Sequence, residues 1–474
     1  MTISRLILII FLGFRLNASA QSIQQRKTDS VFQLVKKCFN LKQADGIYEL
    51  AGQGFRKELT AETFRYVCAN QLFPLGEIKE SSLISFVNDK VATYKIVFDA
   101  ATLQLLMNLD GKDKLELFLF QPFKQEAADN PTAVPTTNLM KTLTDKNIDS
   151  AARKYIQKAN TVGLSIGILK NGAITTYNYG ETARGNRTLP DANTLFEIGS
   201  ITKTFTSTLL AYYVNDGKVK LDDPITKYLP DSVAANKELQ GITLQMLSNH
   251  TCGLPRLPDN FEFHSTSSED PYKDYTKQYL LDYLKTAKLA GKPGKQYAYS
   301  NLAVGLLGAI LEQVNGKTFA QMVQQVITQP LNMQSTAQTL NLKQQNKFVK
   351  VYNENGKETS PWHFDVLAPC GALKSTVTDL LTYAKAQMTP ADNKLLKAMQ
   401  LTHQVTFTRL DMKLGLAWHI IVIDNVAYYF HDGGTYGCSS FLVFNPETKL
   451  AVVVLSNSGA NVNALGADIV KRIQ

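Results

Sequence analysis

Two residues in the middle of the chain have the types and the spacing for acyl-transfer chemistry. Ser200 and Lys203 stand in the stretch FEIGSITK, residues 196–203, and no other serine of the chain has a lysine three positions later. A serine before a helix is an ordinary N-cap, because its hydroxyl can accept a hydrogen bond from the first turn. Residues three apart on a helix also share one face, and a desolvated lysine has a lowered pKa, so its neutral amine can accept the serine proton. Ser200 is therefore a candidate cap and a candidate nucleophile.

Two later segments carry further polar residues at the ends of predicted elements. Tyr299-Ser300-Asn301 stands on a turn before an apolar helix, and His431-Asp432-Gly433-Gly434-Thr435 stands at the end of a strand. Adjacent glycines let a backbone approach a ligand closely, and an N–H group there can donate to an oxyanion. Neither pattern is specific alone. Tyr213-Val214-Asn215 repeats the Tyr-x-Asn spacing, and we interpret that copy as core packing at a helix end.

In their order, the three motifs resemble the serine β-lactamase and penicillin-recognising superfamily, in which Ser-x-x-Lys is followed by Tyr-x-Asn and then by a Lys-Thr-Gly or His-x-Gly strand. Residues 217–230, 243–255 and 371–380 also match the branch that holds class C β-lactamases, certain D-alanyl-D-alanine carboxypeptidases and related esterases. The resemblance extends from about Asn147 to the C-terminus. It implies a serine hydrolase with a β-lactamase-like fold.

The resemblance implies a role for each matching residue. Ser200 is the nucleophile that forms an acyl-enzyme, and Lys203 helps to take its proton. Tyr299 is the general base and acid, either as a phenolate or as a relay with Lys203, and Asn301 orients Lys203 and the substrate amide. The backbone N–H groups of Ser200 and Gly434 form the oxyanion hole.

The third motif departs from the β-lactamase pattern. His431 stands where β-lactamases usually carry lysine, and Asp432 replaces the usual threonine. A carboxylate beside a pocket for a substrate carboxylate is unfavourable unless it turns away, and Thr435 is the candidate for the missing hydroxyl. With Gly433, these residues form the expected substrate-binding strand. The sequence contains no identifiable water-activating glutamate of the class A kind, so Tyr299 would also serve deacylation.

The elements that position these residues predict one large α+β domain over residues 146–474. Its antiparallel sheet is assembled from both ends of the domain, with a mostly helical region, residues 202–333, inserted between them. Asn171-Gly172 is a strong hairpin signal. The expected strands are 162–169, 173–179, 414–423, 426–430, 439–444 and 450–455, and the expected first and last helices are 148–159 and 463–473.

The first twenty residues predict that the protein is exported. Residues 1–20 contain Arg5, an apolar run and Ala18-Ser19-Ala20, the pattern of a secretory signal. A membrane anchor is the alternative, but the run is far shorter than the ~20 residues that span a bilayer. The mature protein is thus expected to be secreted or periplasmic, with no stable membrane span.

Residues 25–121 predict a small α+β accessory domain. The expected helices are 30–39 and 61–71, and alternating strands follow at 91–98, 103–109 and 115–119. The pattern resembles cystatin-like or NTF2-like domains. Residues 122–145 shift to Pro, Ala, Thr and Asn and predict a linker.

Composition excludes several other classes. The net charge of +9 is spread among acidic residues without a basic block, so no nucleic-acid surface is expected. The five cysteines have no C-x-x-C spacing and the six histidines have no ligand spacing, so we expect no metal and no cofactor. The expected partner is a small-molecule or peptide substrate, including cell-wall peptide, and the oligomeric state stays open.

Two alternatives compete with the Ser200 hydrolase. Gly163-Leu164-Ser165-Ile166-Gly167 fits G-x-S-x-G, but that motif requires a strand, a sharp turn and a helix, whereas here the strand continues into a hairpin. The second alternative is a penicillin-binding sensor or scaffold that binds substrate without turnover. We predict a secreted serine hydrolase that cleaves a β-lactam, a D-Ala-D-Ala-type peptide or a small ester.

Overall fold

The structure is a computed structural model that describes residues 22–87, 90–123, 133–409 and 412–474. The chain divides into two compact units, Met1–Glu126 and Ala127–Gln474. The predicted signal peptide, residues 1–20, lies outside the described residues, as does part of the predicted linker. Within the described ranges, no helix is long and apolar enough to cross a membrane.

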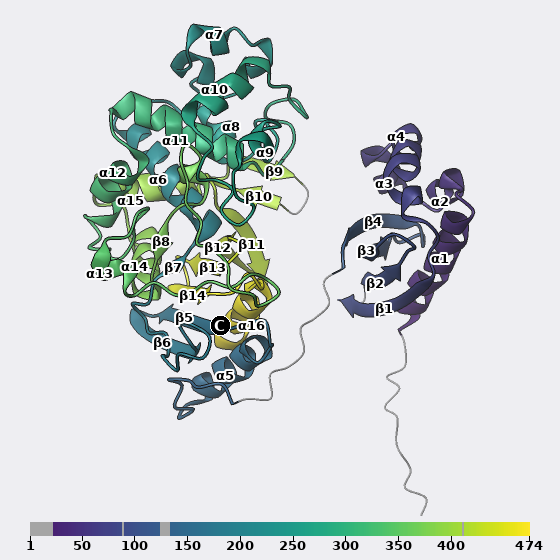
Figure 1. Cartoon of the computed structure of the whole chain (residues 1–474), viewed down its shortest axis with the longest axis horizontal. Helices are drawn as coiled ribbons and strands as arrows, with labels where there is room; N and C mark the ends of the chain where they lie inside the picture. Colours follow the sequence, from purple (N-terminus) through teal and green to yellow (C-terminus); the bar gives the residue numbers. More distant parts are fainter. Residues whose placement is uncertain (1–21, 88–89, 124–132, 410–411) are drawn as a thin grey trace, which may run out of the picture. The chain divides into compact units, whose positions relative to one another are not determined.

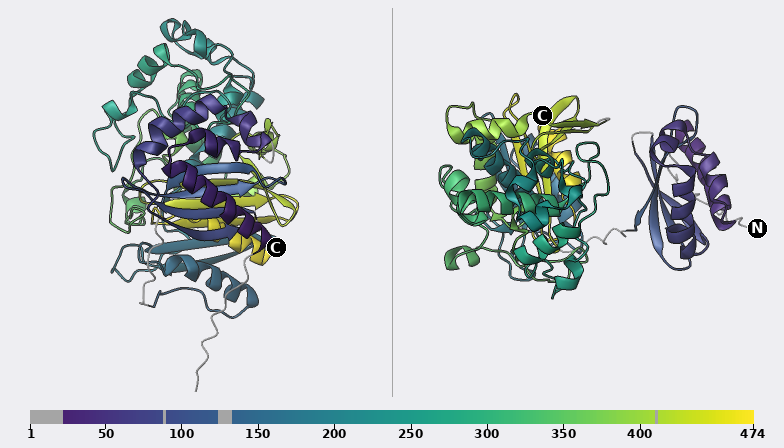
Figure 2. Two further views of the ribbon diagram at one scale, coloured as in Figure 1. Left: turned by 90° about the vertical axis from the view of Figure 1, so that its right-hand side faces the viewer. Right: turned by 90° about the horizontal axis from the view of Figure 1, so that it is seen from above.

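The N-terminal unit is a four-stranded antiparallel meander with its helices on one face (Figure 2). Apolar residues of the first helix, Phe32, Val35 and Phe39, are buried against the sheet. The predicted α+β composition is confirmed, and the likeness to cystatin-like or NTF2-like domains stays a prediction. The elements are α1 (Ile23–Asn40), α2 (Ala44–Glu49), α3 (Gln53–Glu58), α4 (Ala61–Val67), β1 (Glu80–Val87), β2 (Val91–Val97), β3 (Thr102–Leu109) and β4 (Leu115–Pro122).

The C-terminal unit is built on an eight-stranded antiparallel sheet, in the order β6-β5-β14-β13-β12-β11-β10-β9. The first and last thirds of the domain meet where β5 pairs with β14, as predicted. Asn171 and Gly172, both with positive φ, form the predicted turn between β5 and β6. The strands are β5 (Gly163–Lys170), β6 (Ala173–Gly180), β9 (Phe407–Arg409), β10 (Met412–Leu414), β11 (His419–Ile423), β12 (Val426–Gly434), β13 (Ser439–Asn445) and β14 (Leu450–Ser456); β7 (Phe196–Glu197) and β8 (Lys374–Ser375) form a separate pair.

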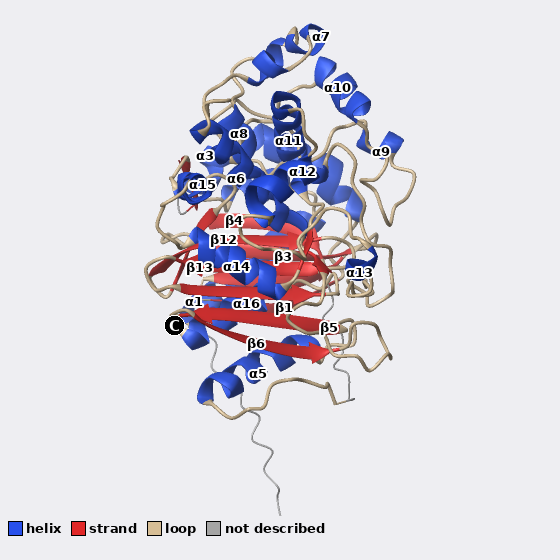
Figure 3. Ribbon diagram, turned by 90° about the vertical axis from the view of Figure 1, so that its left-hand side faces the viewer, coloured by secondary structure: helices blue, strands red, loops and turns tan. Residues whose placement is uncertain are grey.

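Helices cover both faces of this sheet. The inserted helical region gathers beyond one side of it (Figure 1), and α5 lies beside β6 (Figure 3). The helices are α5 (Leu143–Ile156), α6 (Thr202–Asn215), α7 (Asp231–Ala234), α8 (Leu244–Ser248), α9 (Phe261–His264), α10 (Lys277–Thr286), α11 (Asn301–Asn315), α12 (Phe319–Val323), α13 (Leu342–Gln345), α14 (Val377–Gln387), α15 (Lys394–His403) and α16 (Asn463–Ile473).

The central strand β14 separates two hydrophobic cores. All its residues are buried, and successive side chains of a strand point to opposite faces. Ala451, Val453 and Leu455 therefore join the core that contains α6, α11 and α14, whereas Val452 and Val454 join the core under α5 and α16. This two-sided burial explains why the strand reads as a continuous apolar run.

Several predicted boundaries differ from the structure. The predicted helix 30–39 is the second half of α1, the strand predicted at 426–430 continues to Gly434, and β1 was not predicted. The predicted strand 414–423 is interrupted, because Ala417 has a φ of 62° and separates β10 from β11. The first helix of the domain begins five residues before the predicted start, at Leu143, because Thr142 and Asp145 form a capping box. Within the predicted linker 122–145, Thr136 pairs with Tyr179 of β6.

Candidate active site

Ser200 lies on a single 3-10 turn, Gly199–Ile201, between β7 and α6. The N-cap of α6 is Ile201 and makes no side-chain capping bond, so the Ser200 hydroxyl is not used as a helix cap. Instead, the hydroxyl lies 2.8 Å from the amine of Lys203, in the first turn of α6. The predicted spacing thus brings the two side chains together.

The amine of Lys203 is enclosed. The side chain has no exposed surface, and its Nζ donates to Asn301 Oδ1 at 2.9 Å and to the carbonyl of Cys370 at 2.7 Å. No described carboxylate forms an ion pair with it. Burial lowers the pKa of Lys203 to about 8, because the charged form loses its hydration.

Asn301 is held in one orientation at the start of α11. Ser300 caps that helix by accepting a hydrogen bond from Ala303 N at 2.9 Å. The Asn301 amide Nδ2 donates to the hydroxyl of Tyr272 at 2.8 Å, which turns its Oδ1 toward Lys203. The helix cap and the tyrosine together fix an acceptor for the amine.

Tyr299 lies directly beside this group. The centroid of its ring lies 4.8 Å from Lys203 Nζ and 5.1 Å from the guanidinium carbon of Arg256. Burial raises the pKa of Tyr299, and the nearby Ser200 hydroxyl opposes that shift only in part. The phenol is therefore protonated at neutral pH, which disfavours the phenolate form among the two roles that the resemblance implies.

Gly433 of β12 and Gly199 of the Ser200 turn lie in a backbone contact that leaves no room for a side chain at either position. A Cβ on Gly433 would stand 2.0 Å from Ile198 O and 2.9 Å from Ser200 N, and a Cβ on Gly199 would stand 2.7 Å from Gly434 N. Ser440 Oγ on the neighbouring strand donates to Ile198 O at 2.9 Å. Gly199 also has a φ of 47°, so glycine suits both positions.

The register of β12 and β13 determines where the Gly434 N–H points. Thr435 N donates to Cys438 O at 3.0 Å, and Gly434 is the partner of Ser439. Hydrogen-bonded and non-hydrogen-bonded pairs alternate along antiparallel strands, so the Gly434 pair is non-hydrogen-bonded. Its N–H therefore points away from β13, and the closeness of Gly199 to Gly434 N shows that the Ser200 turn is on that side.

His431 is a buried, neutral side chain. It is 1% exposed, its Nδ1 bonds the Asp432 carbonyl at 2.7 Å, and its Nε2 has no partner among the described residues. Burial lowers the pKa of His431 to about 3. The side chain at the usual lysine position thus supplies no positive charge.

Asp432 and Thr435 are each engaged with other residues. Asp432 accepts a hydrogen bond at 2.7 Å from Asn463 Nδ2, at the start of α16, so its carboxylate is turned to that helix. Thr435 donates to the buried carboxylate of Glu197 at 2.6 Å. The Thr435 hydroxyl is therefore already bonded, although the residue also lines a cavity of about 410 Å³.

The sequence patterns did not point to three residues of this site. The Cys370 carbonyl, the Tyr272 hydroxyl and the Arg256 guanidinium all lie within the group around Lys203 and Tyr299. Residues 371–380 and 243–255, which match the family, end or begin next to Cys370 and Arg256. That adjacency could have pointed to Cys370 and Arg256, whereas no sequence signal pointed to Tyr272.

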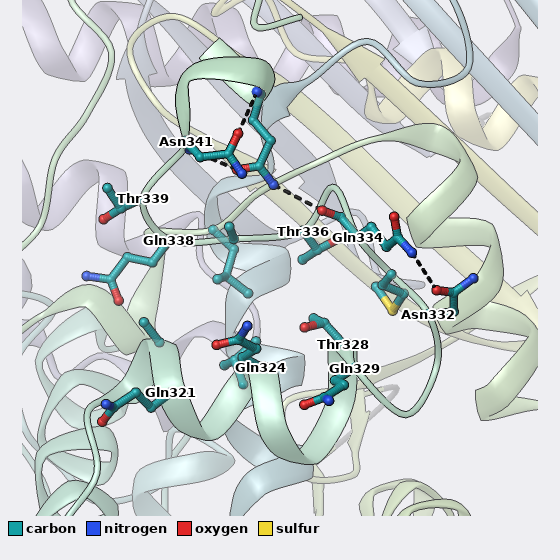
Figure 4. A pocket seen from close by; sticks show the side chains of 16 residues that line it. Gln321, Gln324, Thr328, Gln329, Asn332, Gln334, Thr336, Gln338, Thr339 and Asn341 are labelled. Carbon is teal, nitrogen blue, oxygen red and sulfur yellow. Dashed lines mark hydrogen bonds between the residues drawn. The ribbon is translucent and has the colours of Figure 1, made fainter.

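Other candidate sites lack comparable chemistry. Ser165 is fully buried in the middle of β5, without the strand-turn-helix that its motif requires. A cavity of about 560 Å³ is lined by amide side chains from α12 and the loop after it, and contains none of the predicted site residues (Figure 4). Across the described ranges, no group of three or more His, Cys, Asp or Glu could hold a metal ion.

Comparisons with known proteins cover the C-terminal unit. The family model described as Beta-lactamase matches residues 148–472. The chain belongs to the beta-lactamase family. A beta-lactamase of Pseudomonas fluorescens is 31% identical over 345 residues, which are 65% of this chain and 92% of that protein. The predicted membership, and with it the serine hydrolase class, is confirmed.

Two further relatives represent the carboxypeptidase branch. The D-alanyl-D-alanine-carboxypeptidase/endopeptidase AmpH of Escherichia coli K12 is 35% identical over 194 residues, 40% of this chain and 49% of that protein. The crystal structure of a beta-lactamase/D-alanine carboxypeptidase from Pseudomonas syringae has a TM-score of 0.63 and 25% identity, and the match covers 70% of this chain and 98% of that one. The predicted β-lactamase-like fold is confirmed.

The contact between Gly433 and the Ser200 turn predicts a stability difference between neighbouring glycines. Gly433→Ala should lower the free energy of unfolding by about 1–3 kcal/mol, because the added methyl overlaps Ile198 O. Gly434→Ala is the matched control, since its Cβ would meet no atom within 4 Å. Thermal unfolding of both variants measures the difference. Equal melting temperatures for the two variants would contradict the packing described.

Proposed function

We propose that this protein is a serine hydrolase that cleaves an amide or ester through an acyl-enzyme on Ser200. The observation that carries the proposal is the buried amine of Lys203, 2.8 Å from Ser200 Oγ and without an ion-pair partner among the described residues. With a pKa near 8, about a tenth of this amine is neutral at pH 7. A neutral amine can accept the serine proton.

The hydrogen bonds of Lys203 suit both protonation states. A neutral amine has two N–H donors and one lone pair. The Cys370 carbonyl and Asn301 Oδ1 can only accept, so they take the two N–H groups, and the lone pair faces the Ser200 hydroxyl. After proton transfer, the ammonium has three donors for the same three oxygens. Its partners therefore need no rearrangement during the reaction.

Tyr299 would supply the proton that the leaving group requires. Ser200 Oγ bonds the acyl carbon as its proton passes to Lys203, and the C–N or C–O bond of the substrate then breaks as the phenol protonates the departing atom. Lys203 returns its proton to Tyr299. The protonated state of the buried phenol and its contact with the lysine support this relay.

The oxyanion would form between Ser200 N and Gly434 N. The register directs the Gly434 N–H toward the Ser200 turn, and the missing Cβ atoms of Gly199 and Gly433 allow that approach. Loss of one such donor costs roughly 3 kcal/mol in other serine hydrolases. Deacylation then reverses the sequence with water in place of the leaving group. Water gives a proton to Tyr299 as the phenol passes its own proton to neutral Lys203, and the Lys203 ammonium protonates Ser200 Oγ as the bond between Oγ and the acyl carbon breaks.

The substrate belongs to the classes on which the relatives act or is chemically close to them. β-Lactams, D-Ala-D-Ala peptides and small esters all present an acyl carbon with a leaving nitrogen or oxygen. Relatives are named as beta-lactamases and as a D-alanyl-D-alanine carboxypeptidase. All three substrate classes fit the proposed mechanism.

We also propose that the mature protein acts outside the cytoplasm and begins at Gln21, because residues 1–20 have the signal pattern. Mass spectrometry of the protein expressed from its full gene should find Gln21 as the first residue in the periplasmic or secreted fraction. A cytoplasmic protein that keeps residues 1–20 would contradict this.

Ser200→Ala should abolish both turnover and covalent labelling. The wild type, incubated with nitrocefin, a D-Ala-D-Ala peptide and p-nitrophenyl acetate, should hydrolyse at least one. Intact-mass analysis with a penicillin or a fluorophosphonate should show one adduct, on Ser200. In the variant, turnover should fall by at least about 1,000-fold, because the nucleophile is lost.

Ser165→Ala is the matched serine control and should keep wild-type labelling, provided that circular dichroism shows a folded protein. Loss of labelling only in Ser165→Ala would transfer the nucleophile to β5. Labelling of Ser200 without turnover of any substrate would favour the sensor alternative.

A further inference from the structure

Arg256 is a cation at the candidate site that the motifs do not assign. Its carbonyl accepts hydrogen bonds from Asn301 N at 2.9 Å and Leu302 N at 3.1 Å, and Ser300 Oγ donates to Pro255 O at 2.6 Å. The residue is therefore fixed to the start of α11, immediately after Tyr299. Its backbone position is set by the same helix that holds Asn301.

The Arg256 side chain is exposed and its guanidinium stands 5.1 Å from the centroid of the Tyr299 ring. None of the described carboxylates forms an ion pair with it. Asp432, the acidic residue of the third motif, accepts a hydrogen bond from Asn463. A guanidinium presents a planar set of N–H donors that matches a carboxylate in bidentate geometry. Arg256 is thus free to bind an anion.

The third motif, residues 431–435, does not supply a cation that could bind a substrate carboxylate. His431 occupies the position where a lysine is usual, yet it is almost fully buried and its Nδ1 is bonded to the Asp432 carbonyl. The hydroxyl of Thr435 is bonded to Glu197. A substrate carboxylate would therefore find no cation on β12.

We propose that Arg256 binds a carboxylate on the leaving group of the substrate. This inference rests on the proposed acyl-enzyme chemistry, in which Tyr299 protonates the leaving atom. The Arg256 guanidinium stands 5.1 Å from the centroid of the Tyr299 ring, beside the group that would protonate the leaving atom. We therefore place it with the leaving group and not with the acyl fragment on Ser200. The chemistry that fits is an anionic amine or alcohol leaving group, such as the terminal residue of a peptide. The carboxylate-bearing ring of a β-lactam also fits, although its leaving nitrogen stays tethered to the acyl group after the lactam bond breaks.

Two esters with the same acyl group test the proposal. The phenylacetyl ester of 3-hydroxybenzoate has a carboxylate on its leaving group, and the phenylacetyl ester of phenol has none. The wild type should prefer the first in kcat/KM by about 10- to 100-fold, the size expected for a charge-assisted bidentate pair. In Arg256→Gln the ratio should fall to about one, and Arg256→Lys should keep an intermediate ratio, because it retains the charge but loses the fork.

The ratio is measured on one preparation, so it does not depend on the fraction of active enzyme. Arg187→Gln, which removes another exposed arginine, should keep the wild-type ratio. A wild-type ratio near one, or an Arg256→Gln ratio equal to wild type, would overturn the proposal while leaving the Ser200 chemistry intact. If the wild type hydrolyses neither ester and also none of nitrocefin, the D-Ala-D-Ala peptide and p-nitrophenyl acetate, the proposed function itself fails, and the Arg256 proposal with it.

Two further pairs of substrates identify the source of the carboxylate. A peptide ending in D-Ala-D-Ala is compared with its C-terminal amide, and a cephalosporin is compared with its methyl ester. The pair in which kcat/KM falls on neutralisation, and falls less in Arg256→Gln, contains the natural leaving group. No effect of neutralisation in either pair would count against the proposal.

Discussion

The removal of the Lys203 amine from water is the constraint on which the rest of the site depends. A shift of its pKa from 10.5 to about 8 corresponds to about 3 kcal/mol against the charged form. The amine stays buried because α6 packs between α11 and the segment that ends at Cys370. Its two fixed acceptors, Asn301 Oδ1 and the Cys370 carbonyl, lie 98 and 167 positions from Lys203 in the sequence. Neither acceptor carries a negative charge, so the amine is solvated by dipoles and its pKa stays low. An ion pair with a carboxylate would have raised it.

A second constraint is the close contact between the Ser200 turn and β12. The glycines at positions 199 and 433 let two backbones meet where any side chain would overlap. The same register buries His431 and turns Asp432 toward α16, so no charged side chain of β12 enters the site. Among the described residues, the cations near Ser200 are Lys203 and Arg256, and the Asp432 carboxylate, which also acts on Lys203, is turned to α16. A cation that faces the substrate favours anionic substrates over neutral ones. The pairing register of β12 thus determines both the close backbone contact with the Ser200 turn and the absence of a β12 cation from the site.

The sequence predicted the sheet and the inserted helices from periodicity, and the meeting of Ser200 with Lys203 from helical spacing. The approach of Asn301 to Lys203 was implied by the family resemblance. The sequence could not predict the carbonyl of Cys370, since a backbone acceptor has no residue-type signature. The orientation of Asp432 depended on a register that only pairing with β13 fixes. The break at Ala417 was missed because alanine is not a usual turn residue. β1 was missed because its apolar residues do not alternate, since Leu83 and Ile84 are adjacent, as are Phe86 and Val87.

The most direct test of the account is the pH dependence of the acylation rate constant, measured by pre-steady-state kinetics with a chromogenic ester. Because the neutral amine is the base, and the pKa of Lys203 is lowered, the rate should increase about tenfold per pH unit below pH 8 and level off above it. A matched Tyr299→Phe variant should keep that midpoint while its rate falls. A wild-type rate that does not change between pH 6 and 9, or that continues to rise to pH 10.5, would contradict a buried lysine with a lowered pKa as the proton acceptor.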